Sequence, residues 1–92
     1  MYNRFAEMRR QYLREHRVGI YTGMLLTGKL DEHLAEIGES AQAMFDRLVK
    51  QMKKTEGVTE RLKAENQMEW VGRMNSIRSR AEEVVLSELV YC

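Results

Sequence analysis

The chain has 92 residues, which is enough for one small domain with a modest core. Hydrophobic residues make up 43% of it and charged residues 32%, a balance that excludes a disordered chain and fits a helical protein. Six glycines and no proline favour long helices, and a net charge of +1 gives no sign of the strongly basic character of many nucleic-acid binders.

No apolar run approaches the roughly 20 residues that span a bilayer, so we expect no membrane partner. No basic stretch followed by an apolar one opens the sequence, and we therefore expect a cytoplasmic location. The single cysteine, Cys92, excludes an internal disulfide framework and leaves a disulfide between two chains as a less favoured alternative.

The first expected helix runs from Tyr2 to Arg17 and is amphipathic and basic. Phe5, Met8 and Tyr12 recur every three or four positions, which is the spacing of a helical apolar stripe. Residues 1–29 contain six Arg or Lys against two Glu, whereas the rest of the chain is slightly acidic. The candidate contacts to DNA phosphates or to an acidic partner are Arg9, Arg10, Arg14 and Arg17.

The next segment, Val18–Thr27, is apolar on nearly every side, so we expect a short and well-buried helix. Gly28 is placed to end it in a left-handed cap. Because Gly19 lies at the junction, the first 28 residues form either two helices or one bent helix.

Two long helices follow, over 31–56 and 59–90. Asp31 is expected to cap the first of them, and Gly57 to end it after Lys53 and Lys54. Thr59 is the expected N-cap of the second, with Val58 packing against Leu62. Since the link is only about three residues long, the two should fold back on each other. The predicted fold is all-α, a single domain over 1–92, in which this antiparallel hairpin carries the N-terminal helices at its open end.

Two residues on the inner bands of the hairpin suggest close packing. Gly38 indicates either the close approach of another helix or a tolerated glycine. Trp70 is interpreted as core rather than as part of an aromatic binding site. Asn66 and its polar neighbours are expected to be exposed, the alternative being hydrogen bonds across a helix interface.

The end of the second long helix overhangs its partner and needs a cover. It is covered either by the Val18–Leu30 segment or by the same region of a second chain, and we favour both, in a dimer. An edge strand is a less favoured alternative, because no partner strand is evident. The candidate oligomer-interface residues are Val84, Val85, Leu86, Leu89, Val90 and Tyr91.

The sequence carries no recognisable catalytic or metal-binding constellation. His16 and His33 lie 17 residues apart, without the ligand spacing of a zinc site, so we expect both to be surface histidines. No serine or cysteine has a base nearby in sequence, and no glycine-rich phosphate loop is present. We therefore expect neither an enzyme nor a cofactor, metal or small-molecule substrate.

Three stretches together resemble the transposon-encoded TnpV family, small proteins of bacterial conjugative transposons and related mobile elements. They are RRQYLREHR (9–17), LLTGKLDEHLAEI (25–37) and GVTERLKAENQMEWVGRMNSI (57–77). The resemblance implies a role in a mobile element and brings no catalytic residues with it. We expect a non-enzymatic interaction protein that forms oligomers, or alternatively a DNA-binding accessory or regulatory protein acting through the basic first helix.

Overall fold

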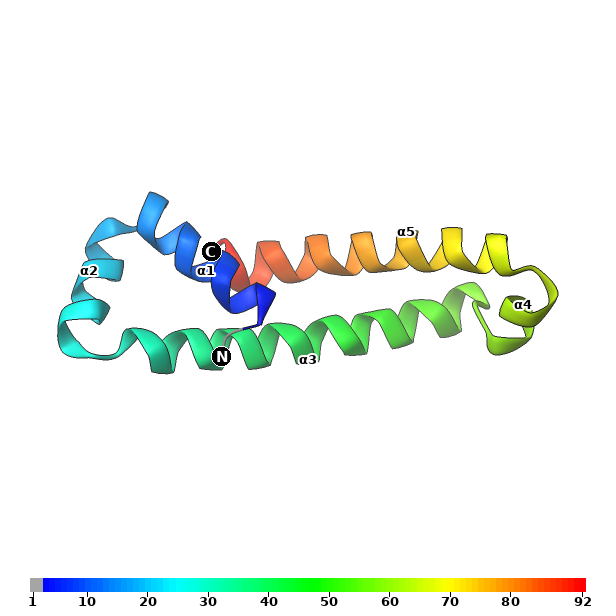
Figure 1. The fold of residues 1–92 in the computed structure, drawn as a ribbon, viewed down its shortest axis with the longest axis horizontal. Helices are drawn as coiled ribbons and strands as arrows, with labels where there is room; N and C mark the ends of the chain where they lie inside the picture. Colours follow the sequence, from blue (N-terminus) through cyan, green and yellow to red (C-terminus); the bar gives the residue numbers. More distant parts are fainter. Residues whose placement is uncertain (1–2) are drawn as a thin grey trace.

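The computed structural model describes residues 3–92, which form a rod of 55 × 20 × 19 Å (Figure 1). Residues 3–92 are helical apart from short connections and contain no strand, so the all-α prediction is confirmed. The elements in chain order are α1 (Arg4–His16), α2 (Val18–Thr27), α3 (Leu30–Glu56), α4 (Glu60–Glu65), α5 (Gln67–Val85) and the π-helical turn η1 (Leu86–Val90).

The predicted hairpin is present: α3 and α5 lie side by side and run in opposite directions (Figure 1). Gly57 ends α3 with φ +68°, a left-handed conformation that favours glycine. The Thr59 hydroxyl accepts a hydrogen bond from the Leu62 N–H, and Val58 is buried beside Trp70 and other side chains. The positions of Gly57 and Thr59 in the sequence therefore predicted the turn of the hairpin correctly.

The second arm of the hairpin is not the single helix that we predicted over 59–90. Asn66, with φ −149° and ψ 85°, breaks it, and the Asn66 side chain accepts a hydrogen bond from the Glu69 N–H. Asn66 thus caps α5, as asparagine does at many helix starts. At the other end the Tyr91 N–H donates to the Leu86 carbonyl oxygen at 2.7 Å, a five-residue spacing that widens the last turn.

The starts of the first three helices also differ in detail from the prediction. The Asn3 side chain caps α1. Arg17 separates α1 from α2, so of the two alternatives for this region two helices are present, with the boundary that was predicted. Gly28 ends α2 with φ +73°, as predicted. However, α3 begins at Leu30 with Lys29 at its cap position, so Asp31 lies in the first turn instead of capping the helix.

The main core lies where α1 crosses the open end of the hairpin. Phe5 is fully buried there with Ala41, Val85 and Val90. The side chain of Asn3 donates to the Gly38 carbonyl oxygen at 2.9 Å, and a Cβ added at Gly38 would lie 3.1 Å from the Ala6 Cβ. Of the two interpretations of this glycine, the close approach of another helix is therefore confirmed, and that helix is α1.

Within the chain it is α1, and not Val18–Leu30, that covers the overhanging end of the hairpin, so this part of the prediction was wrong. The physical reason is that the apolar stripe of α1 fits over Val85 and Val90, and the small residues Gly38 and Ala41 let it come close. Cover by a second chain stays a prediction. The prediction that Val18–Thr27 forms a well-buried helix was also wrong, because α2 contains no buried residue.

Candidate functional site

The most unusual surface of the rod is α2, which closes one end of the rod by joining the end of α1 to the start of α3 (Figure 1). Its ten residues include no charged side chain. Tyr21 and Met24 pack inward against the buried Leu30 and Leu34. The other large apolar residues face solvent, with exposed fractions of 59% for Val18, 52% for Ile20, 55% for Leu25 and 81% for Leu26. These four residues are called the α2 surface below.

The apolar composition of α2 was correctly read from the sequence, but its burial was not. A helix that is apolar on all sides is usually enclosed by neighbours on all sides. Here α2 crosses the end of a rod about 20 Å wide, so only one of its faces finds a partner in the same chain. Contiguous exposed apolar surface of this kind usually marks an interaction site.

Charged residues of opposite sign flank the α2 surface at the two corners of the rod. Where α1 meets α2, Arg14 and Arg17 outnumber Glu15; we call this the basic corner. Where α2 meets α3, Asp31 and Glu32 outnumber Lys29; this is the acidic corner. All six of these residues are exposed.

Arg9, the first of the four predicted contact arginines, is buried instead of exposed. Its guanidinium Nη1 donates to the carbonyl oxygens of Val90 at 3.0 Å and of Cys92 at 2.8 Å. Its Nε donates to Nε2 of His33 at 3.3 Å. Arg9 therefore joins α1 to the end of the chain and to α3, and it is not available to bind phosphate. The prediction that Arg9 contacts DNA phosphates or an acidic partner was therefore wrong.

The neutral form of His33 is the one that fits this arrangement, since only an unprotonated nitrogen accepts a hydrogen bond. Burial lowers the pKa of His33 below its ordinary value of 6.5, and the charge of Arg9 lowers it further. The carboxylate of Glu36 acts in the opposite direction. His33 was expected to be a surface histidine, whereas it is half-buried and takes part in the contact between α1 and α3.

The other three predicted arginines remain at the surface of α1. Arg10 lies 3.5 Å from Glu7 in an ion pair, and Arg14 and Arg17 are exposed. Exposed ion pairs of this kind contribute little to stability, so these cations remain available to a partner.

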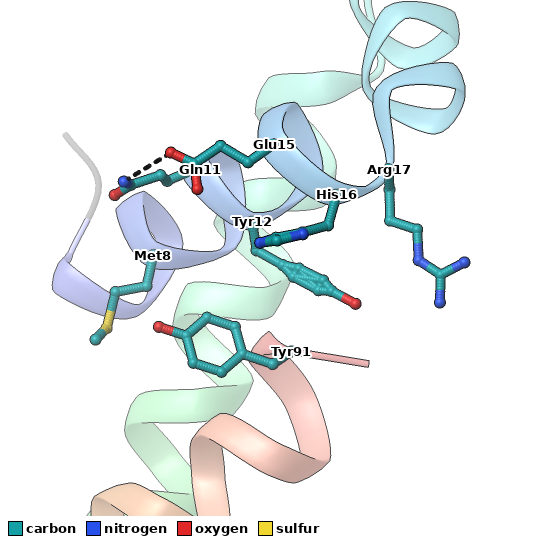
Figure 2. A pocket seen from close by; sticks show the side chains of 7 residues that line it. All are labelled: Met8, Gln11, Tyr12, Glu15, His16, Arg17 and Tyr91. Carbon is teal, nitrogen blue, oxygen red and sulfur yellow. Dashed lines mark hydrogen bonds between the residues drawn. The ribbon is translucent and has the colours of Figure 1, made fainter.

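An open hollow of about 580 Å³ lies between α1 and Tyr91, and of these three arginines Arg17 lines it (Figure 2). The rings of Tyr12 and Tyr91 lie 5.5 Å apart, and His16 meets Tyr12 edge to face at 5.3 Å. Glu15, which accepts a hydrogen bond from Gln11, brings a negative charge to the same wall. This hollow could not be predicted from the sequence, because Tyr12 and Tyr91 lie at opposite ends of the chain.

The six predicted interface residues are divided between the interior and the surface. Val85 and Val90 are fully buried within the single chain, and Tyr91 is 47% exposed. The partly buried members of the set are Val84, Leu86 and Leu89. The reason for expecting an interface here was an uncovered overhang, and α1 supplies that cover. The helix that exposes large apolar side chains is α2 instead.

Two further findings concern ions and membranes. Within residues 3–92, no three histidine, cysteine or acidic side chains come together as a metal site would require. The helices of the same region are too short or too polar to cross a bilayer.

The fold thus defines a small all-α protein, a long helical hairpin closed at its open end by two short helices. The family model described as "Transposon-encoded protein TnpV" matches residues 1–90. The chain therefore belongs to the TnpV family, as the three sequence stretches indicated, and is a transposon-associated protein. Comparisons with curated proteins and with solved structures found no match.

Proposed function

We propose that this transposon-associated protein is a non-enzymatic interaction module that self-associates through the α2 surface. The observation that carries the proposal is the exposure of four large apolar side chains on one uncharged helix. Burying such side chains is favourable by roughly 1.5–3 kcal/mol each when burial is complete. A second copy that covers them would gain much of this free energy.

The best test replaces the most exposed residue of this surface by a charge. We expect the wild-type chain to form dimers at micromolar concentration in analytical ultracentrifugation, and Leu26→Glu to be monomeric. Leu26 is 81% exposed, so its replacement should leave the helical content and the fold unchanged.

Met68 offers a matched control. It is 88% exposed and lies near the start of α5, at the opposite end of the rod (Figure 1). Met68→Glu introduces the same charge and should leave the dimer intact. A dissociation constant of about 100 μM is already weak for a protein complex. A wild-type chain that stays monomeric at about this concentration would therefore contradict the proposal.

DNA binding is a second candidate function, favoured by one observation. Arg10 and Arg14 lie on α1, Arg17 follows this helix directly, and Arg17 also lines the aromatic hollow of Tyr12 and Tyr91 (Figure 2). Cations that contact phosphates give an affinity that falls steeply with salt, and exposed aromatic rings can stack on unpaired bases.

Fluorescence anisotropy with single- and double-stranded DNA from the transposon ends would test this candidate at several salt concentrations. Changing Arg10, Arg14 and Arg17 together to alanine should abolish binding. Changing Lys50, Lys54 and Arg61 together removes the same charge from exposed positions elsewhere and should have little effect. Equal losses in both triple variants would mean that net charge alone, and not this surface, attracts the DNA.

A further inference from the structure

Resting on the proposed self-association, we infer that two copies join end to end through antiparallel α2 helices, related by a two-fold axis near Thr22. In this arrangement the basic corner of each copy faces the acidic corner of its partner. The partner of each chain is thus a second copy of the same chain.

Charge complementarity determines the antiparallel direction. Arg14 and Arg17 lie before α2, whereas Asp31 and Glu32 lie after it. A parallel pair would place each corner against the corner of the same sign, which costs free energy. An antiparallel pair places opposite signs together at both ends of the contact. The apolar α2 surface supplies most of the affinity, and the corners select the direction.

The area of the contact also requires the corners. A stable dimer buries about 800 Å² on each partner, which is more than a helix of ten residues presents on one face. The residues that flank α2 must therefore join the interface. The surfaces next to α2 at this end of the rod are the two corners, and their charges are tolerated in an interface only when opposite signs meet.

The symmetry explains why the assembly stops at two chains. A two-fold contact uses the same patch on both partners and leaves no copy of it free. Because α2 closes one end of the rod, this contact covers that end of both copies at once (Figure 1).

Disulfide crosslinking measures the position of the two-fold axis directly. In a Cys92→Ser background, which removes the one native thiol, Thr22→Cys and Val18→Cys are prepared as separate variants. Both residues are exposed and lie four positions apart, on one face of α2. In the antiparallel pair, the two copies of Val18 lie about 12 Å farther apart along the helix axis than the two copies of Thr22. A disulfide requires Cα atoms within about 7 Å.

We expect rapid oxidation of Thr22→Cys to a covalent dimer and at least tenfold slower oxidation of Val18→Cys. Efficient crosslinking at both positions would indicate parallel helices and overturn the inference, while leaving self-association in place. A dimer by mass that crosslinks at neither position would also overturn it, because the contact would lie elsewhere. A monomer by mass would overturn the proposed function itself.

A charge exchange tests the pairing of the corners. Arg17→Glu and Glu32→Arg should each weaken the dimer about fivefold, since each changes two exposed and symmetric contacts. The double variant restores opposite charges across the axis and should recover the wild-type dissociation constant. If the two losses simply add in the double variant, these corners do not face each other.

Discussion

Arg9 in α1 contacts two distant parts of the chain, α3 and the last residues. Its side chain is only 9% exposed, yet its partners are two carbonyl oxygens and an imidazole nitrogen. An arginine buried without these acceptors would be strongly unfavourable, and the carbonyl of Val90 would in turn lose its donor. Arg9 thus fixes α1, α3 and the end of the chain relative to one another.

Replacing Arg9 should therefore cost much more than replacing an exposed arginine of the same helix. We expect Arg9→Ala to lower the free energy of unfolding by about 2–4 kcal/mol, because it leaves buried carbonyl oxygens unsatisfied and creates a cavity. Arg14→Ala is the control and should change it by less than about 0.5 kcal/mol. Urea unfolding at one fixed protein concentration measures both. Equal effects would mean that the hydrogen bonds of Arg9 add nothing to stability.

The lowered pKa of His33 makes stability depend on pH. The pKa of His33 is lowered below its ordinary 6.5 in the folded chain, by burial and then by Arg9. Between these two pKa values the unfolded state binds more protons than the folded state. The free energy of unfolding should therefore fall as the pH decreases from about 6.5 to the lowered pKa, and no further below it.

Chemical denaturation at several pH values between about 7.5 and 5 measures this dependence. The variant His33→Gln keeps a hydrogen-bond acceptor and removes the titrating group, so it should flatten the curve. If the His33 variant kept the full slope, the pH dependence would belong to other groups.

At the scale of the element, Gly38 determines how closely α1 approaches α3. A Cβ at this position would lie 2.8 Å from the Asn3 Oδ1 atom and 3.1 Å from the Ala6 Cβ. Asn3 cannot move away freely, because Oδ1 caps α1 by accepting from the Ala6 N–H and Nδ2 binds the Gly38 carbonyl oxygen. Both interactions depend on the space that the glycine leaves.

Gly38→Ala and Gly72→Ala should consequently have opposite effects. Alanine in a helix gains about 1 kcal/mol over glycine, and at Gly72 nothing lies within 4 Å to oppose that gain. At Gly38, overpacking and the loss of the α1 cap together exceed the gain, so we expect a net loss of about 1–2 kcal/mol. Thermal unfolding of the two variants gives the comparison. Stabilisation by both would show that α1 can move away at no cost.

The elements that the sequence predicted well are those with a local signal. Gly28 and Gly57 end helices because their left-handed conformations favour glycine, and Thr59 begins one through its own side chain. The capping role of Asn66 was not predicted, because an asparagine in a charged helical stretch can equally be an exposed residue within the helix. Its capping role depends on a break in the backbone that no neighbouring glycine or proline announces.

The packing of whole helices was harder to predict than their ends, because the spacing of apolar residues does not say which helix covers which. The stripe of Phe5, Met8 and Tyr12 indicated that α1 covers something, and the composition of α2 indicated burial even more strongly. The structure assigns the core position to α1, since an amphipathic helix can cover a groove and keep its charges in water. Likewise, nothing in the spacing of the arginines separated buried Arg9 from exposed Arg10, because that difference depends on where the end of the chain lies.

At the scale of the whole molecule, the length of the rod makes the inferred dimer easy to recognise. One chain measures 55 × 20 × 19 Å, and α2 closes one of its ends (Figure 1). Two chains joined through α2 should reach close to twice the longest dimension of one chain. Two chains joined along their sides should keep nearly the same length and double in width instead.

Small-angle X-ray scattering distinguishes these shapes at the concentration where the dimer forms. We expect the longest interatomic distance to be nearly twofold larger for the wild-type chain and for Met68→Glu than for Leu26→Glu, which should scatter as the single rod. Because apolar burial supplies most of the affinity and the corner charges only select direction, the long dimer should persist at high salt. A compact dimer, or a long one that dissociates in salt, would show that the contact does not depend on the apolar α2 surface and would contradict the inference.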